Sequence, residues 1–171
     1  MTMWQHFAST GPVAPSSIER WGPMVPPEIR ALWTDVGTGL IGVDGYIRVI
    51  DPEWYAPGMD VWLDNADGAV PFLTTGMGDV FVWKDPVIRH VLYRTGEVRG
   101  IAPEFESLWS LLELEPYLDA YLSRGDYPGG VQRLGVPAIR DAFYYVPFLM
   151  LGGSPGPENL QSGALAVTLL R

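Results

Sequence analysis

The first clear pattern of apolar and polar positions predicts a helix over residues 27–36. Between Ile29 and Val36, apolar side chains recur at the three- and four-residue spacing of one helix face. Pro27 suits the opening turn, where the missing backbone N–H costs nothing. Gly37 follows directly and favours the left-handed conformation that commonly ends a helix. The glycine-rich residues after it are predicted to form a turn.

Between residues 46 and 101 the pattern changes to short aromatic and β-branched runs separated by turn residues, which is typical of strands. A short helix over 54–63 and a turn over 64–68 interrupt the series. Gly76–Asp79 and Thr95–Gly96 are predicted hairpin turns. The predicted strands are residues 46–50, 72–75, 80–83, 87–93 and 98–101.

From residue 105 the period of the apolar positions returns to that of a helix. Phe105 to Leu112 forms one amphipathic segment and Glu115 to Leu122 a second. Residues 125–130 are predicted as a loop, 144–151 as a fully buried strand, and 158–171 as either strand or helix. Strands followed by helices indicate the α+β class, with an antiparallel sheet of about four to six strands and helices packed on one side. We expect residues 1–171 to form a single compact unit.

The charge of the chain narrows the possible functions. Its 171 residues include 20 acidic and 11 basic side chains and no cysteine, so the formal net charge is −9. The absence of cysteine excludes disulfides and thiol catalysis. The acidity argues against direct binding of nucleic acid, which requires basic side chains, and favours a basic partner. No signal peptide is evident in residues 1–25 and no membrane span is predicted, so we expect a cytoplasmic protein.

The acidic excess is concentrated in residues 101–130, which carry six acids and one base. Such a cluster is either a solvated helix face or a docking surface for a basic partner. By contrast, the bases Lys84, Arg89, Arg94 and Arg99 alternate with acids and are predicted to lie at solvated strand edges. Tyr117, Tyr121 and Tyr127 are candidate aromatic anchors, and Tyr127 is favoured because it lies in a predicted loop. The candidate interface residues are Glu104, Glu106, Glu113, Asp119, Asp126 and Tyr127, with Asp64 and Asp67 as a second patch.

Two glycine motifs suggest catalysis or cofactor binding but lack the required context. Residues 37–42, GTGLIG, match a dinucleotide fingerprint, yet they follow a helix, whereas the fingerprint must precede one. Residues 152–156, GGSPG, match a nucleophile elbow, but Pro155 has no N–H for the oxyanion hole. No histidine follows Ser154 to complete a triad.

No metal site is predicted either. His6 and His90 are far apart in the sequence, and His90 lies within a strand pattern, where a structural role is the default. The run Asp64–Gly68 resembles part of a calcium loop, but its frame places Leu63 at the first ligand position. We therefore predict no enzyme activity, no metal and no cofactor.

Short motifs along the chain resemble a known pair of bacterial domains. The helix opening at Pro27 and the strand that runs into Asp51-Pro52-Glu53 are similar to the GAD-like domain, over residues 1–68. Residues 69–171 resemble the domain usually fused to it, found in immunity proteins of type VI secretion systems. The motifs that carry this second resemblance are Pro71–Thr75, Gly78–Trp83, Tyr145–Phe148, Gly152–Ser154 and Glu158–Leu160.

This resemblance implies a non-enzymatic α+β protein, similar to SUKH-type immunity proteins, that binds and blocks a toxin in the cytoplasm. In several members of the family the toxin is a DNase. A family helix is implied after Leu160, although Gly163 interrupts it here. Acidity agrees with the resemblance, because an acidic inhibitor can occupy the basic cleft of a nuclease. A small-molecule-binding regulatory module with an aromatic-lined pocket, and a hydrolase that uses carboxylates, are the alternatives.

Overall fold

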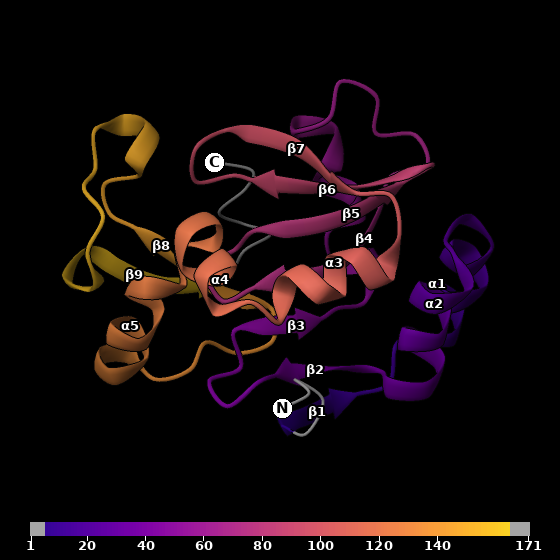
Figure 1. Ribbon diagram of the computed structural model, residues 1–171, viewed down its shortest axis with the longest axis horizontal. Helices are drawn as coiled ribbons and strands as arrows, with labels where there is room; N and C mark the ends of the chain where they lie inside the picture. Colours follow the sequence, from indigo (N-terminus) through magenta and orange to yellow (C-terminus); the bar gives the residue numbers. More distant parts are fainter. Residues whose placement is uncertain (1–5, 165–171) are drawn as a thin grey trace.

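Seven consecutive strands form an antiparallel meander in the computed structural model, which describes residues 6–164 (Figure 1). Each strand pairs with the next one along the chain. The α+β class is therefore confirmed, but the sheet is larger than predicted. The strands are β1 Phe7–Gly11, β2 Thr38–Ile41, β3 Ile47–Val49, β4 Val70–Thr75, β5 Val80–Lys84, β6 Val87–Leu92 and β7 Glu97–Ala102.

The two unexpected strands, β1 and β2, lack an apolar signal of their own. β1 is the mostly exposed sequence FASTG, and β2 lies within the glycine-rich run that was predicted to be a turn. A Cβ on Gly39 would lie 2.3 Å from the ring of Phe7 and 2.6 Å from the carbonyl oxygen of Ala8. Because Gly39 has no side chain, β1 can approach β2 closely.

The predicted first helix is present but irregular. α1 (Pro15–Trp21) precedes α2 (Pro27–Ala31), which continues as a π-helical turn over Leu32–Val36. Gly37 ends this segment with a φ of +80°, as its position predicts. Ile29, Leu32 and Trp33 are buried, so the predicted apolar stripe does face the core.

The helices α3 (Phe105–Leu112) and α4 (Glu115–Leu122) lie across one face of the sheet (Figure 1). Leu108 and Leu112 belong to the same buried cluster as Phe81 and Trp83 of β5. The alternate residues of β5, Val80 and Val82, point to a second cluster on the other face.

Residues 51–69 cover that second face. The predicted helix over 54–63 is instead two 3-10 helices, Pro52–Trp54 and Ala56–Val61. Met59 and Leu63 from this segment pack with Val80 and Val82. The α-helices α3 and α4 lie on one side as predicted, while short 3-10 helices close the other side.

The C-terminal third differs most from the predictions. The predicted loop 125–130 contains a 3-10 turn (Arg124–Asp126) and the start of α5 (Tyr127–Leu134). The predicted strand 144–151 is also wrong, because β8 is Asp141–Tyr145 and Leu149–Leu151 forms a 3-10 turn with Leu151 76% exposed. β8 pairs with β9 (Leu160–Ala164) in a second sheet. The structure thus gives a strand over 160–164, where the family resemblance implies a helix; residues 165–171 lie outside the described residues.

One core joins the two predicted parts of the chain. β3 and β4 pair across the predicted boundary at residue 68. The main buried cluster contains Ile29 and Trp33 from the first part together with Phe72, Leu108 and Phe143 from the second. Among residues 6–164, no helix has the length and apolar character needed to cross a membrane.

Candidate functional site

The helical pair α3–α4 presents an exposed acidic surface. Its inner side chains are buried among the core, whereas Glu104, Glu106, Glu113 and Asp119 are exposed. We call these four residues the acidic surface. The predicted exposure of Glu106 and Glu113 on the side opposite the apolar stripe is therefore confirmed, and whether they bind a partner stays a prediction.

Asp126 has a structural role. Its Oδ2 accepts hydrogen bonds from the Tyr145 hydroxyl at 2.5 Å and from the Gly156 backbone N–H at 3.1 Å. The side chain thereby joins the turn before α5 to β8 and to the loop that leads to β9. Its carboxylate is already occupied by these contacts, so it differs from the freely exposed acids of α3 and α4.

Tyr127 is a core residue, and its prediction as a surface anchor is wrong. Its side chain is fully buried, packs against Tyr46 and Phe143, and donates a hydrogen bond to the Asp44 carbonyl at 3.1 Å. The segment was predicted to be a loop, but it begins a helix that carries the ring inward. Gly76 leaves the necessary space, because a Cβ there would lie 2.1 Å from the tyrosine ring.

The second acidic patch is separate from the first. Asp64 and Asp67 are exposed, as predicted, in the turn that precedes β4. They belong to the segment that covers the opposite face of the sheet from α3 and α4. Lys84 Nζ donates hydrogen bonds to the carbonyl oxygens of Asn65 and Asp67, which places a base beside this patch. The structure does not bring the two acidic groups together.

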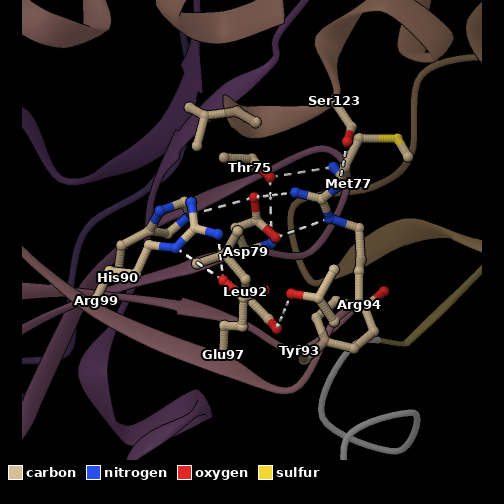
Figure 2. A network of polar contacts seen from close by, with 12 residues as sticks. Thr75, Met77, Asp79, His90, Leu92, Tyr93, Arg94, Glu97, Arg99 and Ser123 are labelled. Carbon is tan, nitrogen blue, oxygen red and sulfur yellow. Dashed lines mark hydrogen bonds and ion pairs between the residues drawn. The ribbon is translucent and has the colours of Figure 1, made fainter. Parts of the chain in front are cut away.

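A buried charge cluster, which the sequence did not predict, joins Asp79, before β5, to Ser123 at the end of α4 (Figure 2). Asp79 is fully buried and accepts two hydrogen bonds from Arg94, from Nε at 3.0 Å and from Nη2 at 2.7 Å. His90 Nε2 lies 3.2 Å from the same carboxylate, at ion-pair distance but without the alignment of a hydrogen bond. We call Asp79, His90 and Arg94 the buried cluster. Arg94, predicted at a solvated strand edge, is only 6% exposed.

The buried cluster connects three parts of the fold. Arg94 follows β6 and donates to Asp79 at the start of β5, and its Nη1 also donates to the hydroxyl of Ser123 at the end of α4. Thr75 Oγ1 accepts hydrogen bonds from the N–H groups of Met77 and Asp79, which orders the β4–β5 turn. The cluster therefore supports the helix that carries Asp119. Within the described residues, no group of acids and histidines is arranged to hold a metal ion.

The environment of Asp79 changes its pKa in opposing directions. Burial alone raises the pKa of this carboxyl, but the Arg94 guanidinium and the adjacent His90 outweigh burial and hold the pKa below its usual value. The charged form of Asp79 is therefore stabilised by folding. The same carboxylate contributes to raising the pKa of the Tyr46 hydroxyl, for which burial is the larger cause.

This shift predicts a dependence of stability on pH. Because the folded pKa lies below the unfolded value of about 3.9, the contribution of Asp79 is complete above that pH and is lost as the pH falls toward the folded pKa. The difference in free energy of unfolding between the wild type and Asp79→Asn should narrow below about pH 4. Urea denaturation of both proteins over a pH series measures this difference. A difference that stays constant down to the lowest pH at which both proteins fold contradicts a lowered pKa for Asp79.

Arg48 is a second buried base that sequence analysis missed. It is fully buried in β3 and donates to the carbonyl oxygens of Pro137 at 3.1 Å and Ala138 at 3.0 Å, and to that of Asp141. Its guanidinium fixes the segment between α5 and β8 against the sheet. No local signal distinguishes it from a surface arginine, because most of its partners are backbone groups about ninety residues further along the chain.

A pocket of about 250 Å³ lies between β7 and the two helices that carry the acidic surface. Tyr117 and Tyr121 of α4 form one wall with their rings stacked, the centroids 5.3 Å apart. Arg99 and Ile101 of β7 form the other wall. His90 of the buried cluster, Gly100 of β7 and Leu111 of α3 complete the lining.

Comparisons with known proteins establish the fold alone. No family model matches the chain, and no curated protein matches it. The crystal structure of Atu4351 from Agrobacterium tumefaciens is similar, with a TM-score of 0.78 and 14% identity over 97% of this chain and 84% of that one. At this identity the likeness shows that the two proteins share an architecture.

Proposed function

We propose that this protein is a cytoplasmic immunity protein that binds a cognate antibacterial toxin and blocks its active site. The toxin in this proposal is a basic nuclease delivered by a type VI secretion system. The observation that carries the proposal is the acidic surface, four exposed carboxylates on a helical pair whose other side is packed into the core. The order of the GAD-like and immunity-domain motifs in the sequence supports the same class.

Electrostatics favour such a partner. A nuclease cleft must attract phosphate and is therefore lined by basic side chains. Carboxylates held on a rigid helical pair imitate that charge, accelerate the encounter and repel acidic competitors. The net charge of −9 adds a long-range attraction toward any basic protein.

Co-expression with the toxin encoded by the neighbouring gene tests the proposal directly. Cells that produce the toxin should survive when this protein is present, and the two chains should purify together. Continued killing, together with the absence of a complex, would refute the proposal.

Reversing two charges of the acidic surface should weaken the complex without unfolding the protein. For Glu106→Lys with Glu113→Lys we expect an association rate lower by about tenfold or more, with a smaller dependence on salt, because steering by charge is lost. Stopped-flow or surface-binding kinetics at several ionic strengths measure both quantities.

The matched control makes the same change of charge elsewhere. Glu19 on α1 and Asp60 in the segment that covers the other face are both exposed, and replacing both with lysine gives the same net charge. If this control slows association as much as the test variant, total charge and not the acidic surface determines the rate.

A further inference from the structure

The pocket between β7 and the helices α3 and α4 combines a largely apolar lining with polar groups at one side. Ile101, Leu111 and the stacked rings of Tyr117 and Tyr121 supply the apolar part. Arg99 provides a half-exposed guanidinium that is held in place by Glu97 on the same strand. An occupant is therefore offered ring faces for stacking together with a hydrogen-bond donor.

The size of the pocket restricts the occupant. Sites for drug-sized ligands have volumes of about 300–1,000 Å³, whereas this pocket has about 250 Å³. It fits one aromatic side chain better than a cofactor or a larger metabolite. Aromatic pairs prefer offset or edge-on contacts with their centroids 4.5–7 Å apart, a geometry that the half-exposed ring of Tyr121 leaves available.

The surroundings indicate where such a side chain comes from. Leu111, Tyr117 and Tyr121 belong to the same two helices as Glu106, Glu113 and Asp119, although helical spacing places the two sets on different sides of those helices. Leu114, between these helices, is 53% exposed, and Tyr121 is 54% exposed. Apolar side chains with charged residues around them are the usual anatomy of a protein interface, where tryptophan and tyrosine are common anchors.

We propose that this pocket receives one tryptophan or tyrosine side chain of the toxin, flanked on the toxin by basic residues that meet the acidic surface. The inference rests on the proposed function, and it adds the position of the anchor and the chemistry of the partner residue. In the bound state the aromatic ring stacks on Tyr121. The hydroxyl of a tyrosine accepts a hydrogen bond from Arg99, whereas the indole N–H of a tryptophan, which can only donate, points away from that guanidinium.

The first experiment tests the pocket in the absence of the toxin. Backbone amide NMR spectra of the full chain are recorded with millimolar N-acetyl-tryptophanamide and, as a control, with N-acetyl-lysinamide. The aromatic probe should shift the signals of residues 99–101, Leu111, Tyr117 and Tyr121, and the lysine probe should not. The absence of such shifts, or equal shifts with both probes, would overturn the inference.

The second experiment measures toxin binding to pocket variants. Tyr121→Ala should raise the dissociation constant at least about 30-fold, equivalent to about 2 kcal/mol. Tyr121→Phe retains the ring and should bind the toxin nearly as tightly as the wild type does. Leu151→Ala, which truncates another exposed apolar side chain, is the control and should not change binding. Circular dichroism checks that each variant is folded.

The possible results separate the two proposals. If the toxin binds the wild type and Tyr121→Ala equally well, the pocket inference is wrong while the immunity function stands. If the toxin does not bind the wild type at all, the proposed function fails, and the toxin-anchor inference fails with it.

Discussion

Replacing Asp79 with asparagine is expected to lower the free energy of unfolding by about 3–5 kcal/mol at pH 7. Arg94 would then remain buried, with its charge no longer compensated by the carboxylate that accepts two of its hydrogen bonds. Breaking one half of a buried ion pair costs more than the pair itself contributes, because the remaining ion cannot return to water. Urea denaturation followed by tryptophan fluorescence measures the loss.

The hairpin of β6 and β7, whose turn carries Arg94, provides a control for this change. Arg99 pairs with Glu97, but both side chains are nearly half exposed, so Arg99→Ala should cost no more than about 1 kcal/mol. Equal costs for Asp79→Asn and Arg99→Ala would show that water reaches the buried cluster. The double variant Asp79→Leu with Arg94→Met should recover part of the lost stability, because it leaves neither charge unpaired.

Replacing Tyr127 with alanine is the second change for which we expect a large effect, a loss of about 3–5 kcal/mol. The side chain is fully buried between Tyr46 and Phe143, so its removal opens a cavity in the main core. The hydroxyl also donates to the Asp44 carbonyl and lies 3.4 Å from Arg48 Nη2. The Tyr127→Ala change therefore removes a partner from both the carbonyl and the guanidinium. Thermal and urea denaturation of the purified variant measure the effect.

Two further variants separate the contributions of the ring and the hydroxyl. Tyr127→Phe keeps the packing and should cost about 1–3 kcal/mol for the unpaired Asp44 carbonyl. Tyr121→Ala truncates a half-exposed tyrosine that stacks on Tyr117, and it should cost no more than about 1.5 kcal/mol. A Tyr127→Ala protein as stable as the wild type would contradict the core role assigned to this residue.

Hydrophobic periodicity predicted most of the middle of the fold from local information. The hairpin of β4 and β5 and the amphipathic α3 follow directly from alternation and helical spacing. β1 and β2 could not be predicted in the same way, because FASTG is polar and mostly exposed and because β2 lies in a glycine-rich run. Their pairing depends on Gly39 having no side chain, which becomes evident only when Phe7 is seen against it.

The sequence predicted which acids of the candidate site are exposed. It did not predict the buried cluster, whose members are brought together from distant parts of the chain. Glu106 and Glu113 lie opposite an apolar stripe, so their exposure follows from helix geometry. The buried cluster unites Asp79 and Arg94, which are fifteen residues apart, with Ser123 on another element. One available signal was the position of Asp79 directly before the uninterrupted apolar run of β5, where an acid needs a buried partner.

The order of the strands also has a consequence for how the chain reaches its folded state. Because each of the seven strands pairs with its neighbour in sequence, several hairpins can form before any distant segment arrives. Loop-closure entropy is then small at most steps, and sheets built in this way fold faster than sheets of equal size with crossed connections. The longest hydrogen-bonded closures are left to Arg48, which donates to the carbonyl oxygen of Ala138, and to Asp44, whose carbonyl oxygen accepts from Tyr127. Chain topology therefore places the docking of the segments that follow α4 late, upon a sheet that is already paired.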